Sequence, residues 1–382
     1  MNNPLRVAIL GTGMIGEVHR RAALLAGAQI VGAMAGSEDS TARAASRWRT
    51  EPLRSIDDLA RLAPDVVHVC TPNSVHAEHV EAAVAAGAHV VCEKPLAVGA
   101  EQAQSLTDLV ARHDRVATVP FVYRFHPLVR EIRARVAAGE FGPWQLLHGS
   151  YLQDWLVSPL ATSWRVDAAA GGPSRAFADI GSHWCDLMEF VTGERIASLT
   201  ATTATTVARR PAGSAATFGG TSGGELRTVD TEDAAVVTFR TASGVLGSVN
   251  VSQVSPGRKN RLWFEFDGQN RSAVFDQENP ETVWLGSETS AEILQRDPGQ
   301  GSADQRRLSH LPAGHGQGYA SCFESFVADT YQAVRGDVPD GLPTFADGLR
   351  SARIIDAVLS SASTGAWVDV PAADLATTGA TR

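Results

Sequence analysis

The sequence has little lysine and cysteine, and it has no long apolar run. Four scattered cysteines, with no C-x-x-C pair and no Cys/His ligand spacing, predict neither a disulfide framework nor a metal site. No apolar stretch reaches the ~18 residues expected of a membrane-spanning helix. Glycines interrupt the apolar segment near the N-terminus, so no secretory signal is predicted. These absences favour a soluble protein that stays in the cytoplasm.

An excess of positive charge is also absent. The chain has 33 basic and 42 acidic residues, for a formal net charge of −9. A nucleic acid or an anionic membrane would require a basic surface patch, so we expect neither as a partner. Anionic cofactors stay possible, because backbone amides at a helix N-terminus hold phosphates without basic side chains.

The two lysines, Lys94 and Lys259, stand out in a chain that otherwise uses arginine. Arginine never releases its proton, whereas the pKa of an ammonium shifts readily with its surroundings. A lysine in such a chain indicates a chemical role, although drift alone could leave two.

The chain of 382 residues is long enough for two domains. Residues 1–122 alternate strand-like and helix-like segments, the pattern of a doubly wound parallel α/β sheet. Residues 123–382 are predicted to form an α+β domain with a large, mostly antiparallel open sheet, because apolar and polar residues alternate along its strands. We expect helices near 184–191, 319–335 and 345–361 to cover one face of that sheet, loops at 209–226 and 297–318, and disorder in the last ten residues.

A glycine-rich turn directly follows the first predicted strand and opens a helix. It reads Gly11-Thr12-Gly13-Met14-Ile15-Gly16. The first glycine allows the tight turn, the second lets the backbone approach a pyrophosphate, and the third allows close packing of helix on strand. The motif predicts a dinucleotide site in a Rossmann domain, against the alternative of a purely structural turn.

The end of the second predicted strand bears on the choice of cofactor. An NAD site usually has an acidic residue there, but this strand runs into Ala35-Gly36-Ser37, with Glu38 and Asp39 just beyond. The two acids would repel a 2′-phosphate. NAD is therefore favoured, NADP is not excluded, and Ser37 is placed among the cofactor contacts.

Two further segments follow buried strands, at the sheet edge where such domains bind ligands. One runs from Thr71-Pro72-Asn73 to His76, and the other is Glu93-Lys94-Pro95. Besides ligand binding, the first segment could be a proline turn in which Ser74 caps a helix. The second could be a surface ion pair before a turn. The scarcity of lysine favours a catalytic Lys94.

A carboxylate and an imidazole, Asp179 and His183, lie four residues apart. On a helical turn this spacing places them on one face, and Gly171-Gly172 upstream would admit a ligand. An imidazole with its ordinary pKa of about 6.5 suits proton transfer near neutral pH. We predict a catalytic cluster on the substrate side, against the alternative of a capping Asp and a buried core His.

Together these motifs resemble the Gfo/Idh/MocA family of NAD(P)-dependent oxidoreductases over almost the whole chain. Glu93-Lys94-Pro95 and the run from Asp179 to His183 are the most specific, in the expected order and separation. Within the family, the segments most similar to levoglucosan dehydrogenases and to glucoside or trehalose 3-dehydrogenases are Tyr151 to Trp155, Ser163-Trp164-Arg165 and Arg258-Lys259-Asn260.

The resemblance implies roles for individual residues. Lys94, Asp179 and His183 would be catalytic, with His183 as general acid/base. NAD(P) contacts would come from the glycine turn and from Thr71, Pro72, Asn73, His76, Glu93, Lys94, Trp164, Arg165 and Tyr319. Substrate contacts would come from Lys94, Tyr123, Arg124, Gln153, Asp154, Trp155, Arg165, Asp179 and His183. Trp155 offers a ring face to a pyranose but is equally typical of plain core. Val122 replaces a common asparagine, which removes a possible nicotinamide contact.

The predicted function is hydride transfer between NAD(P) and a secondary hydroxyl of a sugar, by resemblance at C3 of a glucoside, anhydrosugar or disaccharide. Alternatives are an inositol dehydrogenase, a glycosidase that uses bound NAD for transient oxidation, and a non-catalytic dinucleotide-binding regulator. A regulator needs no proton-transfer group, which argues against the last. The uncovered face of the open sheet, again by resemblance, predicts a homodimer or homotetramer.

Overall fold

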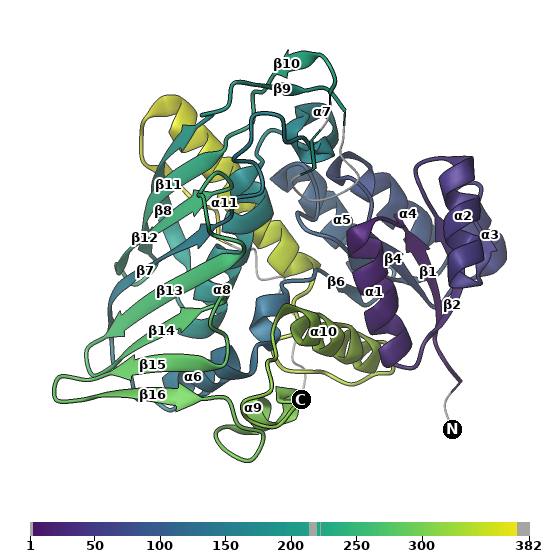
Figure 1. Ribbon diagram of the computed structural model, residues 1–382. Coiled ribbons are helices and arrows are strands. Elements are labelled where there is room, and N and C mark those ends of the chain that lie inside the picture. The colour runs from purple at the N-terminus through teal and green to yellow at the C-terminus, as the bar shows by residue number, and fades with distance from the viewer. Residues whose placement is uncertain (1–2, 214–219, 222, 373–382) are drawn as a thin grey trace.

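Two sheets lie on opposite sides of the molecule, with helices between them (Figure 1). The computed structural model describes residues 3–213, 220–221 and 223–372. One sheet is parallel and belongs to the N-terminal part, and the other is mostly antiparallel. This arrangement confirms the predicted fold class. Within the described ranges no helix is long and apolar enough to cross a membrane.

The parallel sheet has the strand order β3-β2-β1-β4-β5-β6, and each neighbouring pair is parallel. The order reverses between β1 and β4, so the carboxyl ends of these two strands open a crevice. The strands are β1 (Arg6–Leu10), β2 (Gln29–Met34), β3 (Glu51–Pro52), β4 (Val66–Val69), β5 (His89–Cys92) and β6 (Ala117–Thr118). The helices between them are α1 (Met14–Leu25), α2 (Glu38–Trp48), α3 (Asp58–Leu62), η1 (Asn73–Val75), α4 (His76–Ala85) and α5 (Ala100–Arg112).

The second sheet has the order β16-β15-β14-β13-β7-β12-β11-β8-β17. Among its pairs, β7 and β12 run parallel and the others antiparallel. The strands are β7 (Trp144–Leu152), β8 (Ile196–Ala204), β11 (Ala234–Thr241), β12 (Leu246–Ser252), β13 (Arg261–Gly268), β14 (Ser272–Asp276), β15 (Thr282–Gly286), β16 (Ala291–Gln295) and β17 (Val368–Asp369). The alternation of apolar and polar residues predicts strands at 145–152, 198–206, 234–240, 246–253, 262–267 and 272–276, which correspond to β7, β8, β11, β12, β13 and β14. The sequence did not predict β15, β16 or β17.

Alternation along the strands divides this sheet into a buried and an open face. In β13, Leu262, Phe264 and Phe266 are buried, while the residues between them are only half-buried. The buried face packs on α8 (Ser182–Thr192), where the Trp184 indole donates to the Trp263 carbonyl oxygen at 3.0 Å. Gly149 makes room for it, since an added Cβ would lie 2.4 Å from the indole nitrogen.

Of the helices expected to cover the antiparallel sheet, those near 184–191 and 345–361 do so, and the one near 319–335 does not. The helices α6 (Pro127–Ala137), α8 and α11 (Phe345–Thr364) contribute to the core of the antiparallel sheet, and α11 also contacts α5. The prediction that the 319–335 helix covers this sheet is wrong. That helix, α10 (Tyr319–Val334), packs on α1 (Figure 1) and on η2 (Val122–Phe125), because Phe323, Phe326 and Tyr331 join the core behind β1.

Two segments predicted as loops contain regular structure. In 209–226, β9 (Arg209–Pro211) pairs with β10 (Leu226–Thr228), while 214–219 and 222 lie outside the described residues. In 297–318, α9 (Ala303–Leu308) begins at a Ser302 cap. The predicted disorder of the last ten residues also falls outside the described ranges. The boundary between 122 and 123 falls within η2 and stays a prediction.

Candidate active site

Two adjoining cavities lie at the carboxyl edge of the parallel sheet. The larger measures about 700 Å³ and the smaller about 270 Å³. They share Met14, Ile15, Glu93, Lys94 and Arg165, so these side chains form the boundary between them. The predicted cofactor residues that line the larger cavity are Gly11, Thr12, Gly13, Met14, Ile15, Thr71, Pro72, Asn73, Glu93, Lys94, Trp164 and Arg165.

The glycine turn has the geometry expected of a pyrophosphate site. Gly11 has a φ of +99°, and an added Cβ would lie 2.3 Å from the Cys70 carbonyl oxygen. At Gly16 an added Cβ would lie 2.0 Å from the Gly11 carbonyl oxygen, so this glycine lets α1 pack on the turn. Around Gly13, in contrast, no protein atom lies within 4 Å of an added Cβ. The open space at Gly13 is where a phosphate group fits.

Ser37 is placed differently from the prediction. Its hydroxyl caps α2 by accepting from the Ser40 amide, and it does not appear in the cavity wall. The wall at this end consists of Met34, Ala35, Gly36 and Ser40. Glu38 and Asp39 occupy the exposed first turn of α2, directly before Ser40 of the cavity wall.

His76 and Asn73 hold the cavity edge together. The two ring nitrogens of His76 each lie 3.0 Å from a carbonyl oxygen, of Pro95 and of Thr71. His76 therefore joins the two loops from behind and does not line either cavity. The Asn73 side-chain amide donates to the Gly171 carbonyl oxygen at 2.8 Å, which ties the parallel domain to the second domain.

Lys94 and Asp179 form a buried ion pair at the boundary of the cavities. The Lys94 ammonium donates to the Asp179 carboxylate (2.6 Å) and backbone carbonyl (2.8 Å). Gln253 donates to the other carboxylate oxygen at 2.8 Å, and the Arg165 guanidinium lies 3.5 Å from the first. Burial alone would raise the pKa of Asp179, but the charges of Lys94 and Arg165 hold it well below its usual range. Asp179 is therefore ionised at neutral pH.

A π-helical turn, η4 (Phe177–Gly181), carries Asp179 and leads into α8, where His183 lies in the first turn. Such turns break the regular α-helix and are frequent at functional sites. The turn brings Asp179 to the Lys94 ammonium while His183 lines the smaller cavity. The predicted four-residue pairing is thus present, on a more irregular helix than the spacing suggested.

The His183 imidazole is held by aromatic rings. It makes edge-on contacts with Phe121 and Tyr123, with centroids 5.7 and 5.3 Å away. Its Nδ1 is buried and has no hydrogen-bond partner among the described residues. Burial, and next the charge of Lys94, lower the pKa of His183 to about 3. The ring is therefore a neutral imidazole, and the ordinary pKa of about 6.5 expected from the sequence is wrong for this buried position.

A ring of polar side chains lines the far wall of the smaller cavity. The Tyr123 and Tyr151 hydroxyls lie 2.7 Å apart, and both bond to Asn260, which also accepts from the Gln153 amide. Burial raises the pKa of Tyr123 to about 12, so this phenol stays protonated. Of this group, Tyr123 and Gln153 were predicted as substrate contacts. Asn260 and Tyr151 belong to segments that carried the family resemblance, but no role was assigned to them.

The remaining predicted residues have other surroundings. Tyr319 lines the smaller cavity instead of the larger one. Trp155 lies in the wall of the larger cavity and donates to Gln153. Asp154 pairs with Lys259 and lines neither cavity. Gly16 also lies behind the cavity wall, as its packing against Gly11 requires.

Arg124 was predicted to contact the substrate, and the structure places it elsewhere. Its buried guanidinium binds the carboxylates of Asp186 and Asp347 and lies over the Phe190 ring. It lines neither cavity. Arg124 thus joins η2, α8 and α11, and its role is structural.

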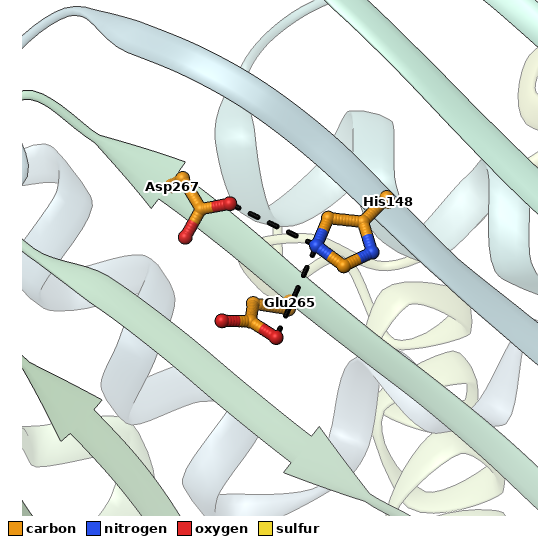
Figure 2. Close-up of side chains that lie close together, drawn as sticks. All are labelled: His148, Glu265 and Asp267. Atoms are coloured by element: carbon orange, nitrogen blue, oxygen red, sulfur yellow. Dashed lines mark ion pairs between the residues drawn. The ribbon is translucent and has the colours of Figure 1, made fainter.

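A separate cluster of metal-ligating types lies on the second sheet, although the sequence showed no ligand spacing. His148 on β7 lies opposite Glu265 on β13, and its Nε2 is 3.9 Å from the Glu265 carboxylate and 3.8 Å from that of Asp267 (Figure 2). These three groups lie within 4.8 Å of one another but line neither cavity. They form a half-exposed ion-pair cluster outside the candidate site.

Comparisons with known proteins identify the family. Residues 5–121 match the model of the oxidoreductase family with an NAD-binding Rossmann fold, and residues 129–274 match the GFO/IDH/MocA C-terminal domain. Over 350 residues the chain is 35% identical to levoglucosan dehydrogenase of Pseudarthrobacter phenanthrenivorans, covering 88% of this chain and 85% of that relative. The chain belongs to the Gfo/Idh/MocA family. It is therefore an NAD-dependent oxidoreductase, as predicted.

Two further comparisons place this Gfo/Idh/MocA protein among its relatives. It is 32% identical to D-glucoside 3-dehydrogenase of Escherichia coli over 200 residues, which is 50% of this chain and 55% of the relative. A solved structure of levoglucosan dehydrogenase in complex with NADH and L-sorbose superposes with a TM-score of 0.87 at 29% identity, covering 96% of this chain and 99% of that one. The complex with NADH and levoglucosan superposes with a TM-score of 0.86 at 28% identity, covering 97% of this chain and all of that one.

Proposed function

We propose that this oxidoreductase oxidises a secondary hydroxyl of a sugar, at C3 of an anhydrosugar such as levoglucosan, of a glucoside or of a disaccharide. The observation that carries the proposal is the meeting of the Lys94–Asp179 pair and His183 where the two cavities adjoin. The larger cavity would hold the dinucleotide and the smaller one the sugar. The similarity to levoglucosan dehydrogenase and D-glucoside 3-dehydrogenase supports this choice of substrate.

The residues of the larger cavity fit NAD. The open space at Gly13 admits the pyrophosphate, and the cavity extends from Ala35 to Lys94. Ser40, Glu38 and Asp39 would lie near the ribose, and Thr71, Asn73 and Trp164 along the nicotinamide half. When bound, NAD supplies the hydride acceptor at the boundary of the two cavities. We keep the prediction that NAD is preferred over NADP, because the acids of α2 would repel a 2′-phosphate.

His183 is the proposed proton acceptor. Its imidazole is neutral, so it can take the hydroxyl proton of the sugar as the hydride leaves the carbon. Tyr123 lies beside the same ring but stays protonated, so it serves as a hydrogen-bond partner.

Lys94 is the proposed stabiliser of negative charge on the reacting oxygen. An ammonium has three N–H bonds, and Asp179 accepts two of them. The third is available to the sugar hydroxyl, where it would stabilise alkoxide character in the transition state. Asp179, held in turn by Gln253, sets the direction of this ammonium.

The polar ring of Tyr123, Tyr151, Gln153 and Asn260 is suited to sugar hydroxyls. Its members offer both donors and acceptors, and their mutual bonds hold each side chain in one orientation. A cavity of about 270 Å³ matches a ligand of one or two sugar rings better than a longer chain. Trp155 would contact the cofactor side instead of stacking on the sugar.

An absorbance screen tests the proposal against its alternatives. Wild-type protein with NAD+ is mixed with levoglucosan, methyl glucosides, trehalose and inositols, and NADH formation is followed. We expect turnover with one of the glucosides or anhydrosugars. Turnover with inositols alone would make it an inositol dehydrogenase. Glycoside cleavage without net NADH would indicate a redox glycosidase, and NADH binding without either reaction would indicate a regulator.

We further propose that the open face of the second sheet pairs with a second copy. Large apolar side chains on this face are exposed, including Leu146, Val236, Leu246 and Ile293. Exposed apolar side chains grouped on one face are typical of an interaction surface, and pairing with a second copy would cover them. We place the protein in the cytoplasm, where NAD is available.

A further inference from the structure

Behind the boundary of the cavities, four buried polar side chains form one hydrogen-bonded chain. Glu93 Oε1 lies 2.9 Å from His19 Nε2, and His19 Nδ1 lies 2.8 Å from His68 Nδ1. His68 Nε2 in turn lies 3.0 Å from the Tyr331 hydroxyl. His19, His68 and Tyr331 have no exposed surface, and Glu93 is 7% exposed. These four hydrogen-bonded side chains therefore run through the core, from α10 to the wall of both cavities.

The number of protons sets the direction of these bonds. An ionised carboxylate only accepts, so His19 Nε2 donates to Glu93. Burial, and next the charge of His19, lower the pKa of His68 well below its usual value, so His68 carries one N–H. With a single N–H, one ring nitrogen of His68 donates and the other accepts, so His68 bonds both to His19 and to the Tyr331 hydroxyl. In this pattern each of the four side chains has a hydrogen-bond partner.

Glu93 is consequently a fixed negative charge. Burial alone would raise the pKa of Glu93, but the hydrogen bond from His19 and the charges of His19 and Lys94 lower it below its usual value. The backbone amide of Lys94 donates to its second oxygen at 3.1 Å. The Lys94 ammonium itself is paired with Asp179. Glu93 thus has a set charge and a set orientation in the wall that both cavities share.

We propose that His19, His68 and Tyr331 are positioning residues that hold Glu93 ionised beside the nicotinamide, where it favours the oxidised cofactor. This inference rests on the proposed function, which places the nicotinamide at the boundary of the cavities. The nicotinamide ring carries a positive charge that hydride addition removes. A fixed carboxylate nearby stabilises the cationic ring more than the neutral one, so it raises the affinity for NAD+ relative to NADH.

The test measures the ratio of the two dissociation constants, Kd for NAD+ over Kd for NADH, by calorimetry on the full chain. Glu93→Gln, which removes the charge, should raise the ratio about tenfold, and His19→Gln and Tyr331→Phe about three- to fivefold. Tyr331→Phe removes a single buried oxygen and keeps the core packed. In the Glu93→Gln background, Tyr331→Phe should add no further change, because both act through one carboxylate.

His126→Gln is the matched control. It replaces a buried histidine that packs on Phe275 and is not part of this hydrogen-bonded group. The substitution should leave the ratio unchanged. An unchanged ratio in Tyr331→Phe and His19→Gln would overturn the inference, and so would an equal loss of affinity for both cofactor forms. If the ratio shifts as predicted but no sugar is oxidised, the proposed function fails and the positioning role stands.

Discussion

Lys94 occupies a place that an arginine does not fit. Its Nζ approaches two oxygens of the same residue, the carbonyl and a carboxylate oxygen of Asp179, and its side chain is 12% exposed. A compact ammonium can satisfy both acceptors and still direct an N–H toward the smaller cavity. A planar guanidinium with its donors in a rigid fork cannot do so without displacing its neighbours.

We therefore expect Lys94→Arg to fail although it keeps the charge. Both Lys94→Arg and Lys94→Ala should lower kcat by about 100-fold or more, since the charge stabilisation at the reacting oxygen is lost. NADH binding should persist, because the glycine turn lies elsewhere. Lys259 also lines the smaller cavity, but it is exposed and pairs with Asp154 instead of with a catalytic residue, so Lys259→Arg should lower kcat far less than Lys94→Arg does. Steady-state kinetics on the three variants decide this, and a Lys94→Arg enzyme near wild-type turnover would refute the assignment.

Buried imidazoles predict a pH dependence of stability. Burial, and next the charge of Arg296, lower the pKa of His126 to about 3, against about 6.5 in an unfolded chain. Between these values the unfolded chain binds more protons than the folded one, so the free energy of unfolding falls as the pH is lowered. His126→Gln should make this fall shallower. Denaturant unfolding at about pH 7 and about pH 5 measures it, and an equal fall in both proteins would contradict the account.

The sequence was informative about single residues where chemistry and position coincide. That Lys94, Asp179 and His183 lie together in one cavity wall could be predicted, because rare or reactive residue types follow a strand or share a helical turn. Gln253 and Asn260 could not be predicted, because they lie just outside β12 and β13 and are 74 and 107 residues away in sequence from their partners Asp179 and Gln153. Arg124 was assigned to the substrate because a motif cannot show that Asp186 and Asp347 close around it.

At the scale of elements, two glycines of the turn have different roles: Gly16 allows close packing, and Gly13 leaves space for the cofactor. Gly16→Ala would place a Cβ 2.0 Å from the Gly11 carbonyl oxygen, whereas Gly13→Ala meets no protein atom within 4 Å. Gly13→Ala should therefore keep the wild-type Tm but weaken NADH binding by about tenfold or more, since the pyrophosphate needs that space. Gly16→Ala should lower the Tm. Thermal unfolding and calorimetric titration measure both effects, and a Gly13→Ala protein with unchanged affinity would place the cofactor elsewhere.

Element prediction succeeded where a single pattern sufficed. Strand–helix alternation predicted the parallel sheet, and period-two alternation predicted β7, β8, β11, β12, β13 and β14 of the second sheet. It missed β16, whose residues are largely exposed on both faces and so lack that alternation. The sequence also predicted that α10 covers the antiparallel sheet, whereas α10 packs in the core behind β1. An amphipathic helix shows that it has a buried face but not which core receives that face.

At the scale of the whole molecule, the uncovered sheet face predicts assembly. Leu146, Val236, Leu246 and Ile293 would otherwise leave apolar area in water. Light scattering at micromolar concentration should return the mass of a dimer or tetramer. A mass near the 40.4 kDa of one chain would rule this out. Leu246→Asp with Val236→Asp should shift the protein toward the monomer, because each buries a charge in the predicted interface.

The central claim is that His183 accepts a sugar proton where the two cavities adjoin, and one paired measurement tests it most directly. NADH formation from levoglucosan or a glucoside is compared for wild type and His183→Ala, together with the Kd for NADH of each. The account predicts wild-type turnover, a loss of about 100-fold or more in His183→Ala, and an NADH affinity that is little changed. His183→Ala turnover near that of wild type would mean that another group takes the proton and would contradict the account.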